Sequence, residues 1–215
     1  MVTTIPEVVV LRLPLYVRVL VALDARGQVV VSSQELGSLL HATPAQIRKD
    51  LSYFGRFGKQ GRGYQVSNLL MELRHIMGID REWSVVLVGV GQLGGAILTY
   101  GGFAPQGFNI VAAFDADPSK LGGSIGNVVV QDIARLKPEV QRRGVHIGIV
   151  AVPAAHCQQV VDQLVDCGVR AILNYAPYQP LTPPGVWVRD IDPVVALQSM
   201  TYHLNAAEDW GLGRV

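Results

Sequence analysis

Three glycines with the spacing G-x-G-x-x-G, at Gly89, Gly91 and Gly94, follow a run of small apolar residues and open an amphipathic stretch. In a strand–turn–helix unit the first glycine permits a tight turn, the second lets the backbone approach a pyrophosphate, and the third allows close packing of helix on strand. The helix N-terminus then faces the phosphate charge. A dinucleotide site is therefore predicted over six consecutive residues: Gly89, Val90, Gly91, Gln92, Leu93 and Gly94.

An acidic residue, Asp115, ends the next apolar run, 21 residues past Gly94. A carboxylate at this point accepts hydrogen bonds from the hydroxyls of the adenine ribose. It also repels a 2′-phosphate, which favours NADH and NAD+ over their phosphorylated counterparts. Two alternatives stay open: a glycine turn without a nucleotide, and a site for another nucleotide such as coenzyme A.

Two further segments end apolar runs and could border the same site, Ala151–Pro153 and Leu173–Pro177. Ligands of parallel α/β sheets lie beyond the carboxyl ends of the strands. Asn174 is a candidate for hydrogen bonds to the nicotinamide carboxamide or its ribose. It could equally be a turn residue ahead of a proline-containing loop.

A cluster of positive charge lies between positions 48 and 62, where five basic residues stand against one acid, Asp50. Residues 1–80 hold nine Lys and Arg against six Asp and Glu, a net charge of +3, whereas residues 81–215 hold nine against eleven, a net charge of −2. Clustered charge of one sign indicates a polyanionic partner more directly than the total does.

The first part of this cluster reads as a helix that starts with Thr43 as N-cap and Pro44 as its first residue. Ile47, Leu51 and Phe54 recur at helical spacing, so they should face a core. The other sides of the helix carry hydrogen-bond donors. A recognition helix places such residues on base edges and phosphates. The candidates are Gln46, Arg48, Lys49, Ser52 and Tyr53.

Neighbouring segments complete a winged helix-turn-helix. Ser32 and Glu35 form a capping box for a preceding helix, and about three residues separate the two helices. The glycine-rich segment after the second helix reads as a hairpin from which Arg56, Lys59 and Arg62 project towards a DNA backbone. An ordinary solvated hairpin and a nucleotide loop are the alternatives, although no G-x-x-x-x-G-K-[ST] motif is present.

Along the chain, helical patterns give way near Gly78–Glu82 to alternating strand and helix patterns. The pattern predicts an α/β protein: an N-terminal winged helix-turn-helix over 1–80, a Rossmann-type parallel sheet over 81–190, and a C-terminal helix and tail over 191–215. Pro14 is expected to start the first helix. Strands are expected at Val85–Val88, Ile110–Phe114, Val128–Val130, Val145–Val152, Ala171–Leu173 and Val186–Val188.

The sequence lacks the motifs that several classes of protein require. No histidine lies at a catalytic spacing from an aspartate, and no HExxH, GxSxG or Cys/His cluster exists, so no catalytic residue and no metal site are predicted. No uncharged apolar run reaches 18 residues, which predicts no membrane span. Cys157 and Cys167 lie ten residues apart on one expected helix, a spacing that disfavours a disulfide between them. We therefore expect two buried thiols in a reducing cytoplasm.

Several motifs together resemble the Rex family of redox-sensing transcriptional repressors. They are R-K-D-L-S-Y-F-G-x-F-G-x-x-G-x-G-Y, V-G-x-G-x-L-G, F-D-x-D-P and I-L-N-Y-A-P, and the likeness runs from about Arg12 to Asn205. The resemblance implies a homodimer that binds double-stranded operator DNA and senses the NADH/NAD+ ratio, with NADH releasing the DNA. It further implies that the last helix is exchanged between subunits and that Arg18, Tyr100 and Asp192 couple the two modules.

A function of a different class also stays open, a small NAD-dependent oxidoreductase whose basic N-terminal part serves dimerisation. About 110 residues of α/β structure leave no room for a separate catalytic domain, and hydride transfer needs a positioned acid or base. The sequence therefore favours a binding protein over an enzyme.

Overall fold

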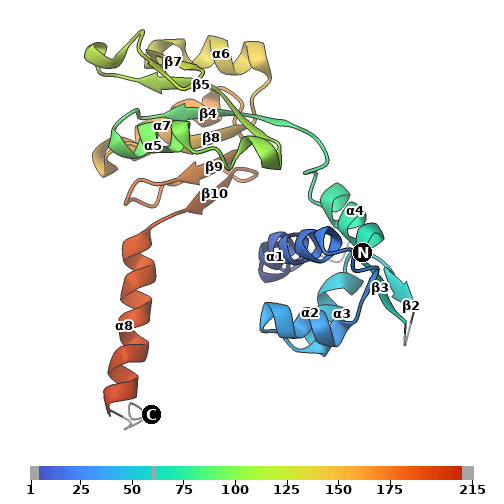
Figure 1. The fold of residues 1–215 in the computed structure, drawn as a ribbon. Coiled ribbons are helices and arrows are strands. Elements are labelled where there is room, and N and C mark those ends of the chain that lie inside the picture. Colours follow the sequence, from blue (N-terminus) through green and yellow to red (C-terminus); the bar gives the residue numbers. More distant parts are fainter. Residues whose placement is uncertain (1–4, 60–61, 210–215) are drawn as a thin grey trace. The chain divides into compact units, whose positions relative to one another are not determined.

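The computed structural model describes residues 5–59 and 62–209, although not the side chains of residue 59 and residues 206–209. The chain divides into two compact units, Met1–Arg81 and Glu82–Val215. Figure 1 shows the helical N-terminal unit and the sheet-based second unit, which confirms the predicted α/β fold class.

In its described residues, the first unit contains four helices and a small antiparallel sheet. The helices are α1 (Glu7–Ala25), α2 (Ser33–Leu40), α3 (Pro44–Ser52) and α4 (Val66–Ile76). The strands are β1 (Val30–Val31), β2 (Gly58–Lys59) and β3 (Gly63–Gln65), in the order β1-β3-β2. The predicted hairpin is thus formed by β2 and β3, and β1 extends it on the other side of β3.

The expected start of the first helix is wrong. Helix α1 begins at Glu7, and Pro14 lies inside it. Val9 and Leu13 are buried in register with Tyr16 and Leu20, so one apolar stripe continues through the proline. This burial outweighs the local cost of an interior proline, which removes one backbone hydrogen bond.

Both predicted N-caps are confirmed. Ser32 Oγ accepts a hydrogen bond from the Glu35 amide at 3.0 Å, and Thr43 Oγ1 accepts one from the Gln46 amide at 3.2 Å. Between α2 and α3, His41 takes a left-handed conformation with φ 52°. The turn is therefore tight and fixed at both ends, which places α3 against the rest of the unit.

The second unit is a seven-stranded sheet in the order β10-β9-β8-β4-β5-β7-β6. All neighbours are parallel except β6 and β7. The strands are β4 (Trp83–Val88), β5 (Phe108–Asp115), β6 (Ser124–Ile125), β7 (Val128–Asp132), β8 (Ile147–Val150), β9 (Ala171–Asn174) and β10 (Trp187–Asp190). Each of the six predicted strands overlaps one of these; β6 was not predicted.

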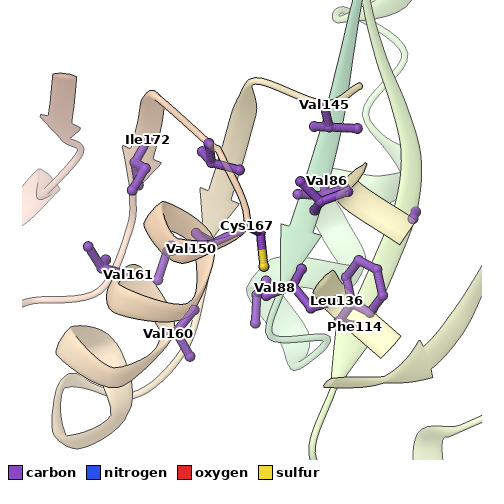
Figure 2. Close-up of a cluster of buried hydrophobic side chains, with 14 of the residues drawn as sticks. Val86, Val88, Phe114, Leu136, Val145, Val150, Val160, Val161, Cys167 and Ile172 are labelled. Carbon is purple, nitrogen blue, oxygen red and sulfur yellow. The ribbon is translucent and has the colours of Figure 1, made fainter. Parts of the chain in front are cut away.

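The sheet carries helices on both faces: α5 (Gln92–Thr99), α6 (Leu136–Arg143) and α7 (Ala154–Asp166). Alternate residues of β4 define the two sides, because Val86 and Val88 pack with α6 and α7, whereas Val85 and Leu87 pack with α5. Figure 2 shows the first of these clusters, in which side chains of the sheet meet those of the covering helices. Both faces of the sheet are therefore apolar, as a buried parallel sheet requires.

Helix α8 (Pro193–Asp209) follows the last strand. Its first turn is capped by Asp192, whose Oδ1 accepts from the Val194 amide at 2.8 Å. Its apolar side chains are exposed in the single chain. They are Val194, Val195, Leu197, Met200, Tyr202 and Leu204.

The core of the second unit can be tested at Leu164, a fully buried residue of α7 that packs on Gly148 of β8. Leu164→Ala leaves a cavity and should lower the free energy of unfolding by about 2–5 kcal/mol, measured by denaturant titration. Leu181→Ala is the matched control, because Leu181 is 80% exposed and its truncation should change stability by less than about 0.5 kcal/mol. Equal effects of the two substitutions would contradict the assigned core.

Candidate functional site

The glycine loop lies between the end of β4 and the start of α5. The Gly89 amide donates to the Phe114 carbonyl at 2.8 Å, and its φ of +98° is one that favours glycine. A Cβ at Gly89 would meet the Ala151 carbonyl oxygen, and a Cβ at Gly94 would meet the Gly89 carbonyl oxygen. By contrast, a Cβ at Gly91 would meet nothing within 4 Å. Two of the glycines are thus needed by the fold, while Gly91 leaves open space at the N-cap of α5.

Asp115 ends β5 beside this loop. One carboxylate oxygen accepts from the Val90 amide at 2.7 Å and from Lys120 Nζ at 3.0 Å, and the other accepts from the Asp117 amide at 2.9 Å. Burial alone would raise the pKa of Asp115, but these hydrogen bonds hold it below its ordinary value. The group is therefore an ionised acceptor at neutral pH, fixed at the mouth of the loop.

A cavity of about 310 Å³ opens at the carboxyl ends of the strands. It combines polar groups of the loop with an apolar wall, as nucleotide pockets do. Ala151–Pro153, predicted as a border of the site, lines this cavity together with Gly89, Gly91 and Asp115. The second predicted border, Leu173–Pro177, does not line it.

One wall of the cavity, formed by α7 and Lys120, was not predicted from the sequence. His156, Gln159, Val160 and Gln163 lie on one face of α7 and line the cavity. Their spacing of three, four and seven residues directly after a strand end was the available signal. Lys120 could have been noticed five residues after Asp115, although nothing in the sequence shows that it folds back to pair with it.

The predicted cofactor ligand Asn174 is fully buried, with 0% exposure. Its Nδ2 donates to the carbonyl oxygens of Ala176 and Tyr178 and to Asp190 Oδ1, at 3.3, 2.7 and 2.8 Å. Its Oδ1 accepts from the Ala176 amide at 3.0 Å and from Cys157 Sγ at 3.5 Å. A nicotinamide contact would require this network to open, so in this conformation Asn174 ties α7, the loop after β9 and the end of β10 together.

The predicted DNA-contacting side chains of α3 divide into two groups. Arg48 and Lys49 are exposed, and Arg48 Nη1 donates to Ser33 Oγ of α2 at 3.0 Å. Ser52 Oγ donates back to the Lys49 carbonyl at 2.7 Å. Gln46 and Tyr53 are half-buried, and Gln46 Nε2 donates to Asp50 Oδ1 at 2.6 Å.

The hairpin carries two exposed arginines. Arg56 and Arg62 border a hollow of about 400 Å³ that the hairpin shares with the end of β1. The side chain of Lys59, the third predicted contact of the hairpin, lies outside the described part of the structure. The exposed guanidinium groups can meet a phosphate backbone without breaking any core contact.

The three residues predicted to couple the modules lie on separate elements. Arg18 is exposed on α1, Tyr100 is 64% exposed just after α5, and Asp192 precedes α8. The Tyr100 ring packs edge-on against Phe103 with ring centroids 5.3 Å apart. All three side chains can therefore be reached by another chain.

In the part of the chain that the structure describes, no group of three or more His, Cys, Asp and Glu side chains is placed to hold a metal ion. Among the described helices, none combines the length and apolarity that crossing a membrane requires.

Two family models match the chain in the order of its units. Residues 4–52 match the putative DNA-binding protein N-terminus, and residues 80–178 match the CoA binding domain. Together with the geometry described above, they define a class: a DNA-binding regulator that joins a winged helix to a nucleotide-binding Rossmann-type domain.

Relatives along nearly the whole chain identify the family. The redox-sensing transcriptional repressor Rex of Chloroflexus aggregans is 54% identical over 199 residues, which covers 93% of this chain and 94% of that protein. A crystal structure of RSP in complex with β-NAD+ and operator DNA has a TM-score of 0.92 at 35% identity, covering 97% of this chain and 96% of that one. RSP in complex with β-NADH has a TM-score of 0.87 at 32% identity, covering 99% and 100%. The chain belongs to the Rex family of redox-sensing transcriptional repressors.

The glycine loop yields a matched pair of substitutions. Gly91→Ala should weaken NADH binding by tenfold or more, because its methyl group would occupy the space a pyrophosphate needs, while the free energy of unfolding stays within about 0.5 kcal/mol. Gly94→Ala forces its methyl group against the Gly89 carbonyl and should lower stability by about 1–3 kcal/mol. Fluorescence titration with NADH and thermal unfolding separate the two. Unchanged NADH affinity in Gly91→Ala would contradict the assigned cradle.

The Asn174 network predicts a structural rather than a ligand role. Asn174→Ala leaves the buried Ala176 amide without its acceptor and removes the links to Tyr178 and Asp190, so the free energy of unfolding should fall by about 1–3 kcal/mol. Gln158→Ala is the control. The half-buried Gln158 also makes hydrogen bonds to a loop, but these bonds are open to solvent, so their loss should cost less than about 1 kcal/mol. If the Asn174→Ala variant were stable but no longer bound NADH, that result would instead support the predicted contact between Asn174 and the cofactor.

Proposed function

We propose that this protein represses transcription by binding operator DNA and that NADH, bound in the Rossmann-type unit, releases it from the DNA. The observation that carries the proposal is the presence in one chain of an exposed basic helix-and-hairpin surface and of a glycine-loop cavity with Asp115. RSP, similar over nearly the whole chain, has been crystallised with β-NAD+ and operator DNA and with β-NADH.

The proposed DNA site consists of α3 and the hairpin. Arg48 and Lys49 near the middle of α3 would reach base edges and phosphates in the major groove, where a recognition helix lies. Gln46, Ser52 and Tyr53 would add polar contacts along the same helix. Arg56, Lys59 and Arg62 would bind the DNA backbone, which positions the protein but does not select sequence.

The proposed dinucleotide site is the cavity beside α5. The segment from Gly89 to Gly94 would cradle the pyrophosphate against the helix N-terminus, and Asp115 would accept from the ribose hydroxyls. Asp115 already accepts hydrogen bonds from the Val90 amide and Lys120. A bound ribose would therefore share the carboxylate with Lys120 or take the place of Lys120. The N-terminal face of α7 would close the other side of the nucleotide.

We also propose a homodimer in which α8 packs against the partner chain. Val194, Leu197, Met200 and Leu204 recur every three or four residues along one side of α8, and a monomer would leave them in water. A second apolar surface lies on the sheet of the same unit, where a hollow of about 350 Å³ is lined mainly by Phe103, Phe108, Ile110 and Ile149. Two such surfaces per chain suit an isologous dimer.

Ligand control requires two states of this dimer. One state would hold the two copies of α3 at the spacing of successive major grooves, about 34–36 Å, and NADH would favour the other state. Arg18, Tyr100 and Asp192 are candidates for contacts that differ between the states. By linkage, DNA must then weaken NADH binding by the same factor by which NADH weakens DNA binding.

The cytoplasm is the proposed compartment, because the chromosomal DNA and the NADH pool that this function needs are found there. Coenzyme A is the second candidate ligand, since residues 80–178 match the CoA binding domain family. A competition titration decides between them: coenzyme A should leave NADH bound at concentrations that saturate a coenzyme-A site, and full displacement of NADH by coenzyme A would overturn the dinucleotide proposal.

The DNA site is tested by the double substitution Arg48→Ala and Lys49→Ala. Operator affinity should fall by at least about 100-fold, because two phosphate or base contacts are lost, whereas NADH affinity should stay unchanged. The control is Arg26→Ala with Lys137→Ala, which removes the same charge at two exposed positions on other elements, the C-cap of α1 and helix α6. If both double variants weaken DNA binding equally, general charge rather than α3 accounts for the affinity, and the proposed recognition helix is wrong.

A further inference from the structure

A single buried carboxylate joins the first helix of the protein to the recognition helix. Asp50 of α3 has no exposed surface. Its Oδ2 accepts from Arg12 Nε at 2.6 Å and from Tyr16 Oη at 2.9 Å, and its Oδ1 accepts from Arg12 Nη2 at 2.7 Å and from Gln46 Nε2 at 2.6 Å. Four donors from two helices therefore converge on one side chain.

This arrangement keeps Asp50 ionised. Burial alone would raise the pKa of Asp50, but the hydrogen bonds from Arg12, Gln46 and Tyr16 together hold it below its ordinary value. The guanidinium of Arg12 binds both carboxylate oxygens, a planar arrangement that also fixes their direction. The position of the carboxylate is thus set from α1 and not by α3 alone.

The charge on Asp50 decides which way the Gln46 amide is turned. An ionised carboxylate can only accept hydrogen bonds, so the Gln46 atom that meets it must be the NH₂ group. The amide oxygen of Gln46 cannot take that place, because two acceptors would face each other. Gln46 is left with one N–H and its carbonyl oxygen for an outside partner.

Gln46 occupies the place in α3 from which bases are read. It is the third residue of the helix, where its backbone amide donates to the N-cap Thr43, and residues at the start of a recognition helix contact base edges. An oxygen acceptor beside an N–H donor matches a base that offers an amino group in the major groove, adenine above all and cytosine second.

We infer that Asp50, held by Arg12 and Tyr16, orients the Gln46 amide and so sets the base preference of the protein at one operator position. The inference rests on the proposed function, in which α3 reads DNA. It makes Asp50, Arg12 and Tyr16 positioning residues for sequence selection, although none of them needs to touch the DNA.

The probe is a library of randomised DNA duplexes, selected first with the unaltered full chain and then with variants. Gln46→Ala should flatten the preference at one position and so identify it. Asp50→Asn should reduce discrimination at that same position by about fivefold or more, because an asparagine both donates and accepts and lets the Gln46 amide turn over. In the Gln46→Ala background, Asp50→Asn should change no base preference further.

Tyr16→Phe is the second variant, in case the buried Asp50→Asn change prevents folding. It removes one donor to Asp50, keeps the ring in the core, and should relax the preference at the same position by a smaller factor. Ser38→Ala is its control, since it removes an exposed hydroxyl of the same unit, which donates to the Gln34 carbonyl within its own helix. Thermal unfolding and NADH binding verify that each variant is folded.

A preference relaxed at the Gln46 position alone supports the inference. A uniform loss of affinity for all sequences in folded Asp50→Asn or Tyr16→Phe overturns it, because the cluster would then only stabilise the helix pair. A failure of the proposed function looks different: the unaltered chain would select no sequence from the library at all.

Discussion

The proposed nucleotide site depends on the carboxylate of Asp115. It holds the Val90 amide of the glycine loop, the Asp117 amide after β5 and the ammonium group of Lys120. The loop between β4 and α5 is thereby locked to the neighbouring strand before any ligand arrives. The close fit of Gly94 on Gly89 completes the turn and aims the start of α5 at the cavity. A site fixed in advance loses little freedom when it binds.

A second buried carboxylate plays the equivalent part in the N-terminal unit. Asp50 accepts hydrogen bonds from donors on α1 and α3, so the orientation of α3, the proposed recognition helix, is tied to α1. Helix α1 also carries Arg18, one of the residues proposed to couple the modules. A displacement of α1 should therefore move α3 with it. Separating the two helices at this contact would leave the buried charge of Asp50 without its partner, which is strongly destabilising.

Local patterns were sufficient for much of this structure. The glycine spacing, the acid at Asp115, the six strands and the caps at Ser32 and Thr43 are all short-range signals, and the structure contains each of them. The helix start at Pro14 was wrongly predicted because proline is favourable in the first turn of a helix. The buried residues Val9 and Leu13, which extend the apolar stripe of α1, precede the proline. The pairs Arg12–Asp50 and Cys157–Asn174 join residues 38 and 17 positions apart, which no local pattern can supply. The face of α7 in the cavity did have a local signal in its helical spacing, but only the fold brings that face to the glycine loop.

Redox sensing by this protein requires that it bind DNA better in one ligand state than in the other. The direct measurement is the affinity of the purified chain for a single selected operator duplex, taken with saturating NADH and with saturating NAD+ at one fixed salt concentration. We expect DNA binding to be weaker by roughly tenfold or more with NADH, within the range that coupled sites commonly show. Equal affinities in the two ligands would contradict redox sensing, whatever the fold and the family.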